Sequence, residues 1–283
     1  MIKILKPIEL VKNTNKIDNE LAKMEWYNNL SIDYKKLVKN SILGLYNSLT
    51  GDDYKQIFLK ILKYIVVVNI DEYEELVIAC YKKLRREYKN IKKIIIQPLQ
   101  TGNEKIKSGT FVSYLFNSHK LSRVDEIYNF TNIPIVIKNQ LSDKDDNKNT
   151  LIVLVDDFIG SGNSAKNSVK YFINNYKIDN LAIIALTCMT EGYKNIKDIN
   201  IPIFYGKKVI TIKEVFNDTE LENAKKVISL LNSKYKFKSK NYLFGYKESM
   251  STIITLRTPN NNLPFIWSGK FNKNTLFKRN ENK

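Results

Sequence analysis

The chain has few of the residues on which metal and disulfide chemistry usually depends. Its 283 residues include a single His, His119, and two Cys, Cys80 and Cys188, which lie far apart and outside any C-x-x-C pair. This content excludes a His-based metal cluster, a Cys-based zinc site and a disulfide framework. We expect His119 to lie at a helix end or on the surface rather than to act as a catalytic base.

Long apolar runs are missing as well. No stretch approaches the roughly 20 apolar residues of a membrane-spanning helix, and the local maximum lies at residues 65–68. The N-terminal MIKILKPIEL has too short an apolar segment for a signal peptide and no small-residue cleavage site. We therefore expect a soluble, cytoplasmic protein that does not act at a membrane.

Arg is scarce although the chain is strongly basic. Lys and Arg number 46 against 29 Asp and Glu, giving a formal net charge of +17, but only five of these cations are Arg. A nucleic-acid reader usually carries more Arg, because its planar fork matches phosphate and guanine. Lys, Asn, Ile, Tyr and Phe are abundant together, which favours an A/T-rich codon bias. A nucleic-acid-associated role stays open, and it would require binding that weakens steeply with salt.

The apolar pattern divides the chain into two kinds of segment. Residues 16–88 carry apolar residues at helical spacing, which predicts helices. We expect the charged faces of these helices to be solvated, and we expect no site chemistry there. From about residue 92, short apolar runs alternate with helical patterns. The runs lie at residues 94–96, 133–137, 151–155, 181–186 and 201–204.

Short apolar runs without alternation, separated by helices, are typical of parallel strands buried on both faces. We therefore predict an α/β fold with a parallel-sheet core at residues 91–235. A helical extension would occupy residues 1–90, and residues 236–283 would pack on the core or complete it. Ligands of such sheets bind beyond the carboxyl ends of the strands, so functional residues should directly follow the apolar runs.

One segment combines carboxylates with a glycine-containing loop. Asp156 and Asp157 follow the run at residues 151–155, and an amphipathic helical pattern extends to Tyr176. The loop between them reads Gly160, Ser161, Gly162, Asn163 and Ser164. Free N–H groups and the helix dipole at such a place bind anions, while carboxylates suit sugar hydroxyls or Mg²⁺. The segment thus suits a ribose 5-phosphate unit.

Two simpler interpretations of this segment stay open. A Gly-Ser-Gly turn can cap a helix and bind nothing, and buried strands commonly end in acidic residues. The segment is not a P-loop, because no Lys follows Gly162.

Residues 151–165 resemble the phosphoribosyl pyrophosphate (PRPP) signature of type I phosphoribosyltransferases. That signature has four apolar residues, two acidic, two apolar, and a small-residue loop of the form Thr/Ser-Gly-x-Thr/Ser. The resemblance implies that Asp156 and Asp157 form the catalytic pair, contacting the ribose 2′- and 3′-hydroxyls or Mg²⁺. It implies that residues 160–164 cradle the 5′-phosphate. Gly160 departs from the Ala or Thr that family members often have.

The same resemblance implies a pyrophosphate-binding loop after an early strand. Lys107, Ser108 and Gly109 end the loop that follows residues 94–96, and Lys138 follows the run at residues 133–137. These four residues are the candidates for pyrophosphate contacts. The alternative is that both lysines are ordinary solvent-exposed residues of a Lys-rich chain.

The two ends of the chain resemble phosphoribosyltransferase-like proteins of bacterial conflict loci, some of them beside antiphage retrons. The resemblance rests on the helical extension with Trp26 and on the C-terminal TPNNNLPFIW, residues 258–267. It implies a role in antiviral defence, with a protein or nucleic-acid partner from such a locus. Trp267 could stack on a base, or it could anchor the C-terminal segment on the core.

Two functions of different classes follow. The first is a glycosyltransferase that binds PRPP or a ribose 5-phosphate nucleotide with Mg²⁺ and makes or breaks a bond at ribose C1′. The second is a non-catalytic sensor of PRPP or a nucleotide that controls a partner. The sensor gains weight because no Glu or His falls in an assignable position for a general base.

Overall fold

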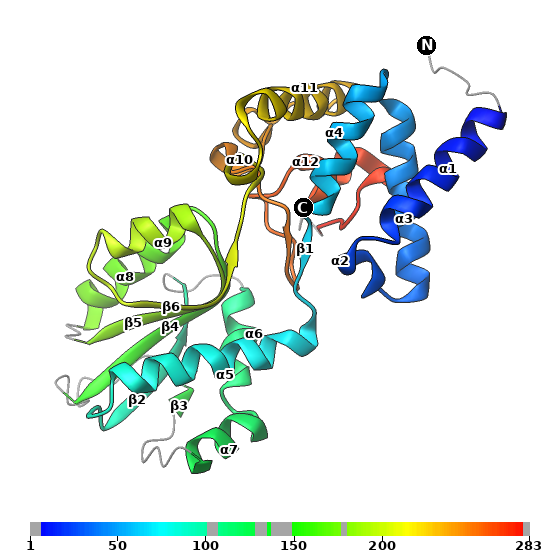
Figure 1. The fold of residues 1–283 in the computed structure, drawn as a ribbon. Helices are drawn as coiled ribbons and strands as arrows, with labels where there is room; N and C mark the ends of the chain where they lie inside the picture. Colours follow the sequence, from blue (N-terminus) through cyan, green and yellow to red (C-terminus); the bar gives the residue numbers. More distant parts are fainter. Residues whose placement is uncertain (1–6, 101–106, 128–134, 137–148, 177–179, 280–283) are drawn as a thin grey trace. The chain divides into compact units, whose positions relative to one another are not determined.

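The computed structural model describes residues 7–100, 107–127, 135–136, 149–176 and 180–279. The chain divides into two compact units. We call Val68–Val209 the α/β unit, and Met1–Val67 together with Ile210–Lys283 the helical unit. In Figure 1 the colours follow the sequence, so the segments that make up each unit can be traced.

A five-stranded sheet forms the centre of the α/β unit. Its strand order is β3-β2-β4-β5-β6, and every pair of neighbours is parallel. The strands are β2 (Lys93–Pro98), β3 (Ile135–Val136), β4 (Thr150–Ile159), β5 (Leu181–Met189) and β6 (Ile203–Val209). All residues of β5 are buried, and β4 is buried except near its carboxyl end. The predicted parallel α/β fold is therefore confirmed.

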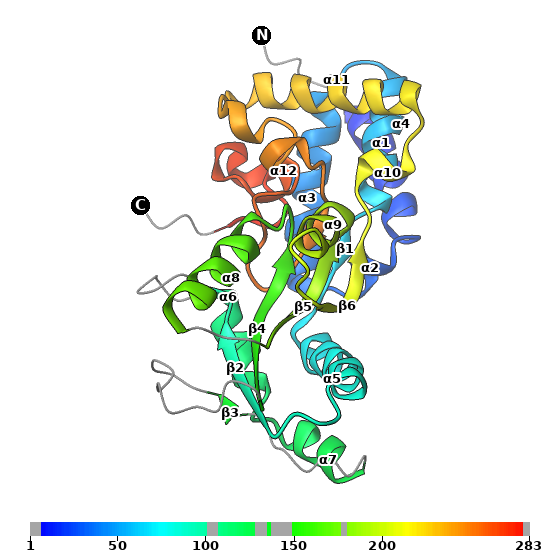
Figure 2. The same ribbon diagram turned by 90° about the vertical axis from the view of Figure 1, so that its left-hand side faces the viewer.

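Helices cover both faces of this sheet, as Figures 1 and 2 show. The helices of the unit are α5 (Ile70–Glu87), α6 (Ser108–Leu115), α7 (His119–Ile127), α8 (Asn163–Tyr176) and α9 (Thr190–Lys197). Side chains of α8 and α9 pack on Ile152 and Leu154 of β4. Helix α5 packs on β5 and β6 from the other side. Burial on both faces explains why the strands read as continuous apolar runs.

The helical unit is built from both ends of the chain. Its elements are α1 (Pro7–Leu21), α2 (Glu25–Asn28), α3 (Ile32–Ser48), α4 (Asp52–Lys63), β1 (Val66–Val67), α10 (Ile212–Val215), α11 (Asp218–Lys234), β7 (Ile253–Ile254) and α12 (Pro264–Trp267), with 3₁₀ turns at Lys240–Tyr242, Tyr246–Glu248 and Gly269–Asn274. Strands β1 and β7 form a parallel pair. One hydrophobic core joins side chains of the N-terminal helices to those of α11 and the C-terminal segment.

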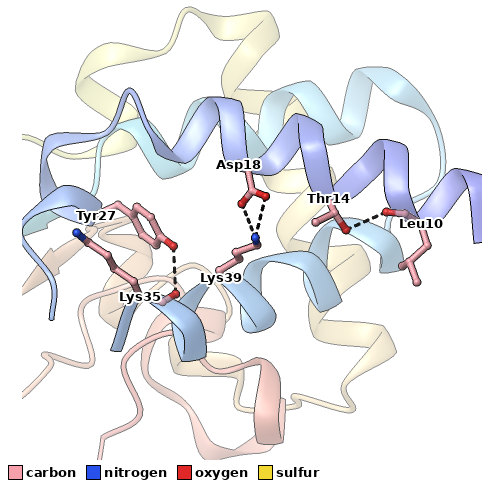
Figure 3. Close-up of polar contacts among 6 residues, drawn as sticks. All are labelled: Leu10, Thr14, Asp18, Tyr27, Lys35 and Lys39. Carbon is pink, nitrogen blue, oxygen red and sulfur yellow. Dashed lines mark hydrogen bonds and ion pairs between the residues drawn. The ribbon is translucent and has the colours of Figure 1, made fainter. Parts of the chain in front are cut away.

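Polar contacts at the surface tie the N-terminal helices together (Figure 3). An ion pair between Asp18 and Lys39 joins α1 to α3, with 2.6 Å between the nearest oxygen and Nζ. The Tyr27 hydroxyl donates to the Lys35 carbonyl at 3.2 Å. Exposed pairs of this kind stabilise a fold little, so the shared apolar core holds this unit.

The boundaries of these units differ from those expected. Helix α5 lies within the expected extension of residues 1–90, but it packs on the sheet of the α/β unit. Conversely, α11 lies within the expected core of residues 91–235, but its Val227, Ile228 and Leu231 belong to the core of the helical unit. Helical periodicity shows which face of a helix is apolar, but it does not show which neighbour covers that face.

No helix in the described ranges is both long enough and apolar enough to cross a membrane.

Candidate functional site

The two predicted carboxylates lie near the carboxyl end of β4, the central strand of the sheet. Asp156 is partly accessible, whereas Asp157 is only 4% exposed. Successive side chains of a strand point to opposite faces, so the two carboxylates have different surroundings. This asymmetry is absent from the sequence pattern, in which the two residues look equivalent.

Ser108 brings the predicted pyrophosphate loop to the predicted ribose site. Helix α6 begins at Ser108 with Lys107 at its N-cap position. The Ser108 hydroxyl donates to Asp156 Oδ1 at 2.7 Å. The same oxygen accepts the backbone N–H of Asp157 at 2.9 Å. Two segments that lie 48 residues apart in the sequence therefore meet at one carboxylate.

Gly109 allows this close approach. A Cβ at position 109 would lie 2.5 Å from the carbonyl oxygen of Val155 and 3.2 Å from the backbone nitrogen of Leu99. Those two atoms are themselves joined by a hydrogen bond of 2.9 Å, which links the residue after β2 to β4. A residue with a side chain would fit at this place only if the start of α6 moved away from the strands.

The pKa of Asp156 lies well above its usual value. Burial is the largest cause, because it disfavours the charged carboxylate, and the neighbouring carboxylate of Asp157 adds repulsion. The hydrogen bonds from Ser108 and from the Asp157 backbone act in the opposite direction and are weaker. An ionised Asp156 is thus costly in free energy without a ligand, and a cation or hydroxyl donor would reduce this cost.

Asp157 is held by groups from two other elements. The hydroxyl of Tyr73, in the first turn of α5, donates to Asp157 Oδ2 at 3.1 Å. Thr187 of β5 donates its hydroxyl to the Asp157 carbonyl at 2.8 Å. Tyr73 lies within residues 16–88, where no site chemistry was expected, and yet it contacts one of the predicted carboxylates. Its helical spacing identified it as a buried face residue, and no local signal distinguishes it from other buried tyrosines.

The predicted phosphate loop connects β4 to α8. Gly162 adopts a φ of +78°, a left-handed conformation that favours glycine. Helix α8 begins at Asn163, and Ser164 lies exposed in its first turn. The loop and the free N–H groups of the first turn therefore have the arrangement that binds phosphate at helix N-termini.

Helix α9 supports this loop, which the sequence did not indicate. Asn195 donates its side-chain N–H to the Ser161 carbonyl at 2.9 Å. A Cβ on Gly192 would lie 2.4 Å from the Gly160 carbonyl oxygen, so α9 and the loop are in close backbone contact.

Two further residues were predicted for the site, Lys138 and Trp267. Lys138 lies outside the described residues. Trp267 lies in the hydrophobic core of the helical unit, 7% exposed, with its ring edge-on to Phe237 and Tyr242. Its Nε1 donates to the Asn262 carbonyl at 3.0 Å. These contacts favour the C-terminal anchor over base stacking.

His119 is exposed at the start of α7, as expected.

Trp267→Phe is expected to lower the free energy of unfolding of the helical unit by about 1–3 kcal/mol. The change removes a buried hydrogen bond and leaves the Asn262 carbonyl without this donor. Thermal or urea unfolding measures the effect. If the variant unfolded like the wild type but lost nucleotide affinity, Trp267 would instead be a base-stacking residue.

The described residues contain no group of three or more His, Cys, Asp or Glu side chains arranged to hold a metal ion. Among the described residues, the carboxylates of the candidate site are those of Asp156 and Asp157. Such a donor set fits Mg²⁺, which keeps several waters and commonly binds through one or two carboxylates together with substrate phosphates.

A parallel sheet, an acidic pair at its central strand and a small-residue loop at a helix N-terminus are features of α/β proteins that bind nucleotides or sugar phosphates. The chain belongs to the family described as PRTase-CE, whose model matches residues 25–279, where PRTase denotes phosphoribosyltransferase. This membership supports a function of phosphoribosyltransferase type. The match spans both units, so the helical unit is part of what defines the family.

Solved structures similar to this chain include several phosphoribosyltransferases. A purine phosphoribosyltransferase from Pyrococcus horikoshii Ot3 is 15% identical with a TM-score of 0.30, covering 50% of this chain and 87% of its own. An orotate phosphoribosyltransferase from Mycobacterium tuberculosis H37Rv, in complex with PRPP, is 9% identical with a TM-score of 0.32, covering 61% of this chain and 96% of its own. No curated protein sequence matches the chain.

Proposed function

We propose that the α/β unit binds PRPP or a ribose 5-phosphate nucleotide with Mg²⁺ and makes or breaks a bond at ribose C1′. One observation carries this proposal: the hydrogen bond of 2.7 Å between Ser108 and Asp156. It joins the segment that suits a pyrophosphate to the segment that suits a ribose 5-phosphate. PRPP is a ligand that carries both groups, on C1′ and C5′ of one sugar.

Each part of the site has a distinct task in this proposal. The N–H groups at the start of α8, with the Ser161 and Ser164 hydroxyls, hold the 5′-phosphate. The carboxylate of Asp156 accepts hydrogen bonds from the ribose hydroxyls, and Lys107 with the start of α6 receives the pyrophosphate. These groups fix the sugar on both sides of C1′, which lowers the entropy cost of reaching the transition state.

Mg²⁺ would be held by Asp156, the accessible member of the pair, together with the ligand's own oxygens. When bound, this ion neutralises charge on the pyrophosphate as it leaves. In the transfer direction the C1′–O bond breaks and its electron pair leaves with pyrophosphate. The acceptor's lone pair forms the new bond to C1′, and the acceptor then loses a proton.

The double variant Asp156→Asn with Asp157→Asn tests this proposal. It should retain the fold but lose PRPP or nucleotide turnover, because amides accept hydrogen bonds and bind Mg²⁺ more weakly than carboxylates do. Mass spectrometry of nucleotides and bases, incubated with the protein, PRPP and Mg²⁺, measures turnover. Undiminished turnover in the double variant would contradict the site assignment.

Asp52 and Asp53 provide a matched control. They form a second adjacent pair of aspartates, both exposed in the first turn of α4 in the helical unit. The variant Asp52→Asn with Asp53→Asn makes the same change of charge and should keep the turnover of the wild type.

The sensor function makes a different prediction for the wild-type protein. Calorimetry would show PRPP or nucleotide binding, but no pyrophosphate or free base would be released. Support for this alternative comes from the sequence, in which no Glu or His falls in an assignable position for a general base.

We also propose a role in antiviral defence with a partner from the same locus. Support comes from the helical extension and the C-terminal segment, which resemble those of phosphoribosyltransferase-like proteins from bacterial conflict loci. In this chain the two segments pack together in one core. Phage plating on cells that express the wild type or the double variant tests it. A nucleic-acid partner would show binding that weakens steeply with salt, whereas salt-insensitive binding would favour a protein.

A further inference from the structure

Tyr73 contacts both halves of the candidate site. Its hydroxyl donates to Asp157 Oδ2 at 3.1 Å, and its ring packs edge-on against Phe111 of α6 with 5.9 Å between ring centroids. Helix α6 is the helix whose first residue, Ser108, donates to Asp156. One side chain of α5 thus lies against the helix that begins at the pyrophosphate loop and also binds one member of the acidic pair.

The burial of Asp157 makes this hydrogen bond consequential. Asp157 is 4% exposed and Tyr73 is 1% exposed, so water cannot readily replace the tyrosine hydroxyl. A buried carboxylate that loses a donor is left under-solvated, which is costly, and it must reorient toward another donor. That change would move Asp157 relative to Asp156, whose Oδ1 accepts the Asp157 backbone N–H.

We propose that Tyr73 is a positioning residue, whose hydroxyl fixes the Asp157 carboxylate so that the acidic pair presents one geometry to the ribose. In this arrangement Asp156 meets the ligand directly, and Asp157 is anchored by Tyr73 at its side chain and by Thr187 at its carbonyl. The inference rests on the proposed function, because it assumes that the pair binds the ribose of PRPP or of a nucleotide.

Tyr73→Phe isolates the hydroxyl. The phenyl ring keeps its contact with Phe111, and the donor to Asp157 is lost. We expect the variant to bind PRPP with Mg²⁺ about 10- to 100-fold more weakly, the range for a lost hydrogen bond to a charged group. Isothermal calorimetry on the full chain measures the dissociation constant.

Tyr81→Phe is the matched control. Tyr81 lies eight residues farther along the same helix, is fully buried, and packs on Phe116 near the other end of α6 with 6.0 Å between ring centroids. A general loss of packing or stability in α5 should affect both variants alike, whereas a positioning role should weaken PRPP binding only in Tyr73→Phe.

A double-mutant cycle with Asp157→Asn separates positioning from structural support. If Tyr73 acts through Asp157, Tyr73→Phe should weaken PRPP binding in the wild-type background and change it less than twofold in the Asp157→Asn background. Equal weakening in both backgrounds would overturn the inference.

The inference and the proposed function fail in different ways. A wild-type chain that binds neither PRPP nor nucleotides with Mg²⁺ overturns the proposed function, and the inference with it. A wild-type chain that binds PRPP, together with a Tyr73→Phe variant of equal affinity, overturns the inference alone.

Discussion

Asp156→Asn is expected to reduce PRPP turnover by a factor on the order of 10² or more while making the α/β unit more stable at neutral pH. The amide is nearly the same shape, and its oxygen can still accept from Ser108 and from the Asp157 backbone. What the variant loses is the negative charge, which the proposed binding of PRPP and Mg²⁺ would require and which the ligand-free fold disfavours.

The sign of the stability effect follows from the raised pKa of Asp156. Because the folded state binds this proton more tightly than the unfolded state, the contribution to stability is complete below about pH 4, the ordinary range of an Asp. It is lost as the pH rises toward the pKa of the folded state. The variant has no such loss, so its advantage should grow with pH over this interval and then level off.

Thermal unfolding of both proteins between pH 4 and pH 8 measures this difference. We expect a gain on the order of 1 kcal/mol at neutral pH, or about 2–4 °C in Tm. The control is Asp198→Asn, the same substitution at an exposed position of the same unit, which should change Tm little. A less stable Asp156→Asn protein, or one that turns over PRPP like the wild type, would contradict the description of this carboxylate.

Gly109→Ala is expected to damage the site and the fold together. The added methyl group would lie 2.5 Å from the Val155 carbonyl oxygen, and its other close neighbours are backbone atoms of Pro98 and Leu99. Backbone atoms of two paired strands cannot turn aside as a side chain can. Helix α6 must therefore move away from β4, which carries Ser108 away from Asp156.

We expect this variant to lose about 1–3 kcal/mol of stability, the usual effect of overpacking, and to bind PRPP at least tenfold more weakly. Calorimetry and urea unfolding measure the two effects. Thr110→Ala provides the control, because Thr110 is the next residue of α6 and is exposed. If Gly109→Ala bound PRPP with wild-type affinity, close contact between the start of α6 and the strands would not be required for PRPP binding.

The strands of the sheet could be predicted from the sequence because strands buried on both faces appear as short runs of consecutive apolar residues. The runs at residues 94–96, 151–155, 181–186 and 201–204 all lie in or overlap β2, β4, β5 and β6. Apolar runs do not encode the order of strands in a sheet, so the central position of β4 became visible only in three dimensions. Helices α9 and α11 were not anticipated at all.

The acidic pair and the loop after it could likewise be identified, because the whole motif is contiguous from Leu151 to Ala165. Tyr73 and Asn195 could not, because each acts on the motif from another helix, and its partner is fixed only by the packing of that helix. Trp267 shows the opposite case: its place in a conspicuous motif suggested a ligand contact, and the structure shows a buried anchor.

The α/β unit is inserted into the helical unit, which sets the order in which the two can fold during synthesis. Residues 68–209 leave the ribosome before residues 210–283, and the α/β unit then has its whole sheet. The N-terminal helices cannot complete their core at that point, because Phe265 and Phe271 of the same core are synthesised last. A nascent chain that has just passed residue 209 therefore carries a complete α/β unit beside helices whose apolar faces are uncovered, the state in which chaperones are most needed.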